Sequence, residues 1–141
     1  MRQTLVIAGF LTVSIVSHVG AARGQTAENG QLYVCADATS ASVHELGITL
    51  CDATATPELE RRAEEDNLQS REGARVVSLD DAGVSARAGL QPGDVVYRVG
   101  GVDIDTAEAT AEILSKIGTR SDTIVNFLRG GRPYRVKLRR N

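Results

Sequence analysis

The fold of this chain is decided by the stretch Ala88-Gly-Leu-Gln-Pro-Gly-Asp-Val-Val-Tyr-Arg-Val-Gly-Gly-Val-Asp-Ile104. Gly89 and Gly93 stand where a chain leaving a short helix must turn into a strand, and glycine is favoured there because it tolerates positive φ. The apolar run at 95–99 predicts a buried strand. The Gly-Gly pair at 100–101 then reverses the chain. The stretch therefore predicts a helical turn, a central strand and a tight turn in succession.

Residues 1–24 have the pattern of a secretory signal peptide. Arg2 supplies a positive charge, residues 5–16 are mostly apolar, and small residues follow at 20–24. Cleavage after Ala22 or after Gly24 fits this pattern equally well. The apolar run is shorter than the roughly 20 residues that a spanning helix needs. We therefore expect an exported protein, periplasmic or secreted, without stable membrane insertion after cleavage; a retained anchor is the alternative.

If the protein is exported, Cys35 and Cys51 would lie in an oxidising compartment. In a small exported chain such a pair favours a disulfide, and two buried free thiols are the alternative. A metal site would be incomplete, because His44 is the only further soft ligand outside the signal segment. The net charge of −2 gives no general attraction to nucleic acid. We expect no cofactor, no metal and no nucleic-acid partner.

The rest of the chain divides into short strands and helices. Gln31 to Cys35 is a possible short strand, and residues 36–42 are expected to form a loop. Thr56 is the expected N-cap of a helix to about residue 67, and Asp105 that of a second helix closed by Gly118. Alternation and turn residues predict the remaining elements: strands at 47–51, 74–79, 94–99, 123–129 and 132–139, and a helical turn at 84–88.

The stretch 88–104, in this order of elements, resembles a PDZ domain, most closely those of bacterial HtrA-type envelope proteases. The resemblance extends from about His44 to Leu138. It implies an α+β, PDZ-like fold, a small and partly open β-barrel or sandwich of five to six strands with two helices. The expected organisation is a signal peptide at 1–24, a leader with a possible short strand at 25–43 and a PDZ domain at 44–139.

The resemblance also implies a function. PDZ domains bind the free C-terminus of a peptide, which adds as a strand to a sheet edge while backbone amides hold its carboxylate. The loop of this family matches Glu45-Leu46-Gly47-Ile48. The opposite wall would be the helix after residue 105, and because Ala107 offers no hydrogen bond, selectivity is expected to be hydrophobic. The peptide-binding residues implied are Glu45, Leu46, Gly47, Ile48, Thr49, Leu50, Ala107, Ala111 and Leu114.

Three classes of function can be compared on the sequence. An enzyme is disfavoured, because His44 is the only histidine outside the signal segment and no serine-protease or His-Glu-x-x-His motif occurs. The favoured reading is an exported interaction module that binds protein C-termini or peptides with an apolar last residue. The alternative is a PDZ-like adaptor in an envelope or secretion assembly that binds no peptide.

The cysteines bear on whether the chain is a peptide-binding module or an adaptor that binds no peptide. A Cys35–Cys51 bridge would bring the segment 31–34 near the ligand-binding edge. That segment could pack beyond the carboxylate loop and stiffen it, or it could pair with the Ile48 strand and occupy the groove. The sequence leaves open whether the groove is accessible.

Overall fold

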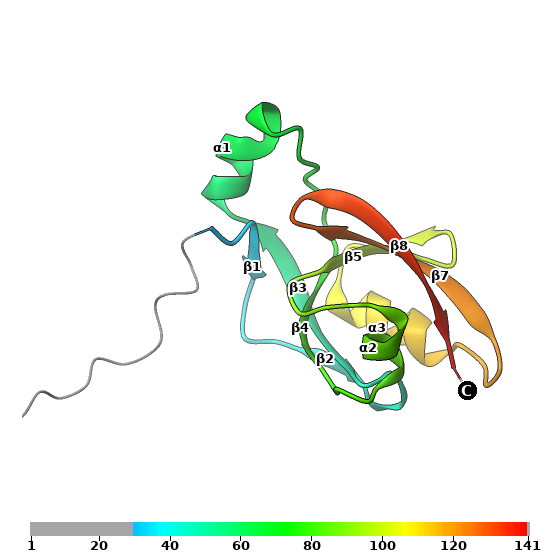
Figure 1. The fold of residues 1–141 in the computed structure, drawn as a ribbon. Helices are drawn as coiled ribbons and strands as arrows, with labels where there is room; N and C mark the ends of the chain where they lie inside the picture. The colour runs from blue at the N-terminus through cyan, green and yellow to red at the C-terminus, as the bar shows by residue number, and fades with distance from the viewer. Residues whose placement is uncertain (1–29, 141) are drawn as a thin grey trace, which may run out of the picture.

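The computed structural model describes residues 30–140, so the predicted signal peptide lies outside the described residues. The described chain forms an antiparallel sheet of eight strands in the order β1-β3-β4-β5-β7-β8, with β2 paired to β3 and β6 paired to β5 (Figure 1). The strands are β1 Tyr33–Cys35, β2 Ala41–Val43, β3 Ile48–Ala55, β4 Ala74–Leu79, β5 Val95–Val99, β6 Val102–Asp103, β7 Asp122–Arg129 and β8 Arg132–Arg139. The helices are α1 Pro57–Glu65, α2 Val84–Ala88 and α3 Ala107–Ser115, with a 3-10 turn, η1, at His44–Leu46.

The predicted α+β, PDZ-like fold is confirmed, with more strands than expected. β2 and β6 are additions to the predicted strands. The first two residues of β2 lie in the segment 36–42, where a loop was expected. β1 and β2 both pair with β3. The boundary predicted at residue 44 therefore falls between two strands of one sheet.

Both longer helices begin at a threonine N-cap. The cap of α1 is the predicted residue, and the cap of α3 lies one residue later than predicted. Thr56 caps α1, accepting a hydrogen bond from the Leu59 amide at 3.4 Å. At α3 the cap is Thr106 rather than Asp105, and its hydroxyl accepts from the Ala109 amide at 3.1 Å. This prediction was wrong by one residue, and α3 ends with Lys116 as its C-cap before it reaches Gly118.

Two hydrophobic clusters cover the two faces of the sheet. The larger lies on the α3 side and contains Leu46, Ile48, Leu50, Val76, Leu114 and Phe127 among others. The smaller lies on the α1 side and joins Leu59 to Val95, Tyr97 and Leu128. Tyr33 of β1 belongs to the smaller cluster and is only 6% exposed. The N-terminal strand is thus packed into the domain and does not hang from it.

The turn before β5 is held by a buried carboxylate. Gly89 and Gly93 have φ of 104° and 93°, as the sequence predicts for these glycines. Asp94 is 1% exposed and accepts hydrogen bonds from the Gln91 amide at 2.8 Å and from Arg129 Nε at 2.8 Å and Nη2 at 2.7 Å. The side-chain hydrogen bonding between Asp94 and Arg129 raises the pKa of the Arg129 guanidinium. Asp94 thereby ties the turn to the end of β7.

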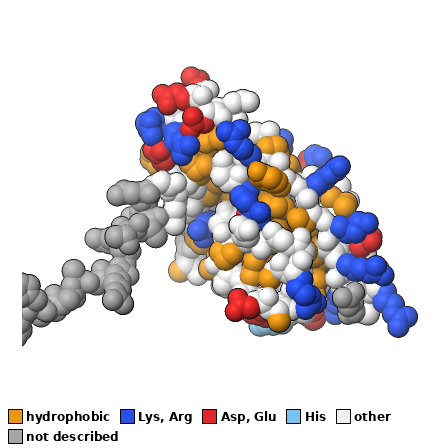
Figure 2. Space-filling view, in the orientation of Figure 1, with side chains coloured by type: hydrophobic (Ala, Val, Ile, Leu, Met, Phe, Trp, Pro, Cys, Tyr) orange, Lys and Arg blue, Asp and Glu red, His pale blue; other side chains and the backbone are white. Residues whose placement is uncertain are grey.

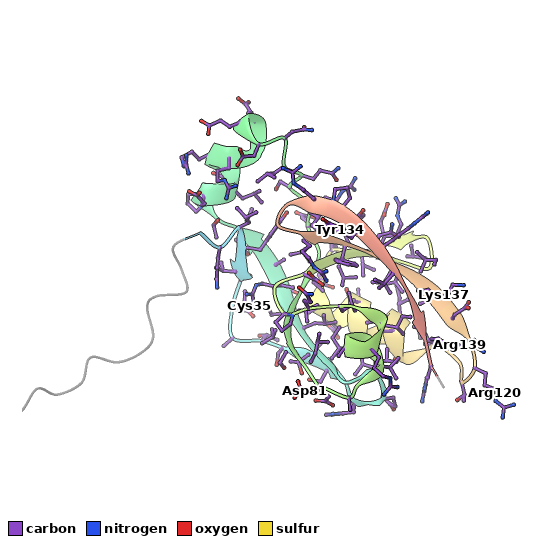
Figure 3. All side chains as sticks on the ribbon, in the orientation of Figure 1. Cys35, Asp81, Arg120, Tyr134, Lys137 and Arg139 are labelled. Carbon is purple, nitrogen blue, oxygen red and sulfur yellow. A yellow bond between two sulfur atoms is a disulfide. The ribbon has the colours of Figure 1, made fainter. Side chains whose placement is uncertain are left out.

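Charge is distributed unevenly over the surface. Acidic and basic side chains gather over α1, and Lys and Arg side chains follow the side of the molecule where β8 runs (Figures 2 and 3). β8 stands at the end of the strand order, and exposed Arg132, Arg135, Lys137 and Arg139 line it. Pro133 also lies in this strand, where a missing N–H is tolerated at a sheet edge.

Replacing Asp94 with asparagine is expected to destabilise the domain. The asparagine NH₂ group would face donors of Arg129, and charge-assisted hydrogen bonds would be lost. We expect a loss of about 2 kcal/mol in the free energy of unfolding, allowing for the partial exposure of Arg129. Urea denaturation measures it. Asp103→Asn is the control, since the Arg98–Asp103 pair lies on the surface and should change stability little. Equal effects of the two variants would contradict the assignment.

Cys35 and Cys51 form a disulfide with a sequence separation of 16 residues. Reduction is expected to lower the free energy of unfolding by about 3 kcal/mol, because the unfolded chain regains the freedom of the open loop. Thermal unfolding with and without reductant measures this. The double variant Cys35→Ser, Cys51→Ser should unfold at the lower temperature and be insensitive to reductant; an unchanged melting temperature on reduction of the wild type would refute the prediction.

Candidate functional site

The candidate site is the edge of β3 that faces α3. On its other edge β3 pairs with β4, with Ile48 opposite Leu79 and Asp52 opposite Ala74. Ile48 and Leu50 point into the larger cluster and are 2% and 0% exposed. Alternation along the strand turns Thr49 to the opposite face. The beginning of β3 thus supplies an apolar floor beside the helix.

The structure brings most of the predicted peptide-binding residues together. Leu46, Ile48, Leu50, Ala107 and Leu114 are buried in the same cluster, with Ala111 packed against it. Ala107 is the first residue of α3, so it, Ala111 and Leu114 follow one stripe of the helix. Glu45 is exposed and Thr49 faces away, so these two stand outside the apolar cluster. Their role in binding stays a prediction.

The loop before β3 is a tight turn built around Gly47. Gly47 has φ 63° and ψ 45°, and its amide donates to the His44 carbonyl at 3.1 Å. Its carbonyl accepts from the Asp80 amide at 2.9 Å, and a Cβ at this position would lie 2.9 Å from Asp80 Cβ. Both the backbone conformation and the close approach of Asp80 therefore require glycine.

The groove between β3 and α3 is occupied at its carboxylate end by β2. Residues 41–43 pair antiparallel with β3, Ala41 opposite Leu50, Ser42 opposite Thr49 and Val43 opposite Ile48. α3 packs against β2 from the other side. Val43 is 3% exposed inside the larger cluster, and Ala41 packs against that cluster. The sequence analysis missed this, although the alternation of Ala41 and Val43 with the polar Ser42 is a weak signal for a strand.

The disulfide places the preceding segment elsewhere on the same strand. β1 pairs with the far end of β3, Tyr33 opposite Ala55 and Cys35 opposite Ala53, and Cys35 lies at the end of β1 (Figure 3). The segment 31–34 therefore does not cover Ile48, and it does not lie beside the loop at Gly47. Residues 41–43, which lie between the two cysteines, are the part of the leader that enters the groove.

Beyond β2 the groove remains open. A cavity of about 430 Å³ is lined by Thr39, Ser40, Ala41, Asp52, Thr106, Ala107 and Glu108. Asp52 reaches from β3 to the start of α3, where its Oδ1 accepts from the Ala107 amide at 2.6 Å. This bond satisfies a free amide at the first turn of the helix and fixes the width of the groove at this end. Asp52 was not predicted from the sequence, because its partner is distant in the chain.

His44 is exposed at the mouth of the loop. Across residues 30–140, no three His, Cys, Asp or Glu side chains lie close enough together to hold a metal ion. Nor does any helix in this part of the chain have the length and apolarity to cross a membrane. The described site combines an apolar pocket that Val43 fills, a glycine turn and an edge of β3 that β2 covers.

Known proteins with a similar sequence or fold agree with this description of the domain. Residues 75–129 match the family model of the PDZ domain. A protein of Halomonas elongata, named as a probable periplasmic serine endoprotease and DegP-like, is 33% identical over 67 residues. The match takes in 48% of this chain and only 14% of that protein.

Two solved structures share the fold. The HtrA-type protease AlgW with a decapeptide is 24% identical, with a TM-score of 0.52 over 67% of this chain and 27% of its own. The HtrA3 PDZ domain bound to the phage-derived ligand FGRWV is 20% identical, with a TM-score of 0.51 over 68% of this chain and 84% of its own. The resemblance found in the stretch 88–104 is thus confirmed: residues 75–129 match the PDZ model, and the fold is similar to that of HtrA-type PDZ domains.

Proposed function

We propose that this chain is an exported interaction module that binds the free C-terminus of a peptide or protein by strand addition to β3. A PDZ domain is a non-catalytic interaction module, and strand addition needs an edge with unpaired backbone groups beside a side-chain pocket. The single observation that carries the proposal is the position of β2 between β3 and α3. An antiparallel strand fits between β3 and α3 with an apolar side chain beside the Gly47 turn.

The pocket chemistry supports an apolar last residue in the ligand. Val43 lies there against Leu46, Ile48 and Leu114, all nearly inaccessible to water. An unpaired polar or charged side chain in such a place would lose its hydration without compensation. The ligand FGRWV of the HtrA3 domain also has valine as its final letter. The residues proposed to contact a ligand are the nine predicted from the sequence, with Leu46, Ile48 and Leu114 forming the pocket.

Export is part of the proposal. The pattern of residues 1–24 is that of a signal peptide. The disulfide between Cys35 and Cys51 suits an oxidising compartment, and the Halomonas relative is named as periplasmic. We propose a periplasmic or secreted location, with 25–43 leading into the binding domain at 44–139.

A second candidate is an adaptor whose groove takes no ligand. The observation that favours it is again β2, since Val43 already fills the pocket. In that case the surface of the domain, and not its groove, would contact a partner in an envelope or secretion assembly. Screening the chain against a random library of C-terminal peptides separates the two candidates.

The first prediction for the groove concerns the carboxylate. Peptides selected from such a library should bind with a free carboxylate and lose about 1 kcal/mol or more of binding free energy when their C-terminus is amidated, since a hydrogen bond to a charged group is removed. Isothermal titration calorimetry on matched peptide pairs measures this. Equal affinity of the two forms would argue against capture of a carboxylate.

The second prediction concerns Gly47. Gly47→Ala should abolish most peptide binding, because the new Cβ would be strained at φ 63° and would collide with Asp80. Gly101→Ala is the matched control: its φ is also positive, at 82°, but the structure leaves open space around it. The control should bind as the wild type does. Peptide binding that survives Gly47→Ala would mean that the loop has been assigned wrongly.

A further inference from the structure

The strand in the groove has the features of a bound ligand. Its direction is antiparallel to β3, its register brings Val43 opposite Ile48, and Val43 directly precedes the turn at 44–47. Ala41 and Val43 face the cluster below α3 while Ser42 is exposed. The Ser42 and Thr49 hydroxyls lie 3.0 Å apart on the outer face. A peptide arriving from outside would need the same edge and the same pocket.

We propose that residues 41–43 act as an intramolecular ligand of the groove, and that an external ligand binds by displacing them. The proposal rests on the proposed peptide-binding function and names the ligand class: a C-terminal segment with valine or a similar residue last and a small residue third from last. Those are the positions held by Val43 and Ala41. Ala41 lies opposite Leu50 and borders the open cavity beside the first turn of α3.

β2 can leave without unfolding the sheet. It contributes only residues 41–43, whereas β3 keeps β4 on one edge and β1 at its far end. The segment 36–43 is held at Cys35 by the disulfide and at His44 by the turn. Its extended length is roughly 30 Å, while the matching stretch of β3 from Cys51 back to Gly47 spans about 13 Å. The segment therefore has slack enough to loop out while the disulfide stays intact.

The two attachments make β2 a strong competitor. A segment fixed at both ends remains near its site, with an effective concentration on the order of millimolar for short connections. The apparent affinity of an external peptide falls by the fraction of molecules in which the groove is open. Cys35–Cys51 therefore acts as a tether that keeps the competitor close.

The test compares two glycine variants of the full chain. Val43→Gly removes the apolar side chain from the pocket, and Ser42→Gly gives the neighbouring residue the same backbone freedom without touching the pocket. The probe is a fluorescent peptide of residues 37–43 with a free C-terminal carboxylate. We expect Val43→Gly to bind it about tenfold or more tightly than the wild type, in keeping with the lost burial of one valine. Ser42→Gly should bind within about threefold of the wild type, which corresponds to the loss of one exposed hydrogen bond.

Hydrogen exchange on the wild type gives a second measurement that needs no variant. Saturating peptide should speed exchange of the amides at 41–43 and keep those of Ile48 to Leu50 protected. Equal binding of the probe by all three proteins, or amides at 41–43 that stay protected in the complex, would overturn the displacement while peptide binding stands. If neither the probe nor any library peptide binds any of the proteins, the proposed function falls and this inference falls with it.

Discussion

β3 is the element on which the rest of the structure depends. It pairs with β4 on one edge and with β1 and β2 on the other. It carries Cys51 of the disulfide, and its Asp52 binds the first amide of α3. The turn, the helix and the N-terminal segment are therefore all fixed to one strand. Both walls of the groove are set by that strand, so in the proposed displacement β2 moves while they stay in place.

Much of the fold could be predicted because its signals are local. The long strands alternate and are bounded by glycine turns, and the turn before β5 carries Gly89 and Gly93 at positions where the structure has positive φ. The errors arose where a distant residue decides. β2 is short and built partly of Ala41 and Ser42, which favour strands weakly, so it exists through its pairing with β3. The start of α3 was displaced by one residue because Thr106, not Asp105, caps it, and Asp52, far away in the sequence, accepts from the first amide of the helix.

The sequence named residues for the candidate site but did not predict the strand that covers them. Leu46, Ile48 and Leu114 could be named because a sequence resemblance assigns a loop and a helix to them, and the structure brings them into one cluster. Whether that cluster faces a ligand or the chain itself depends on the register of residues 41–43, which no local pattern encodes. The same holds for Asp52, whose position at the helix start follows from the packing of α3 on β3.

The cover over β3 also bears on how the domain avoids pairing with other chains. A bare strand edge is a template on which other chains can pair and aggregate. At the opposite end of the sheet β8 carries Arg132, Arg135, Lys137 and Arg139 together with Pro133, and such residues discourage pairing. The edge at Ile48 to Leu50 has no comparable charges and is sealed by β2. If β2 leaves only as a peptide enters, the edge at Ile48 to Leu50 is never left bare for a second unfolded or partly folded chain to pair with.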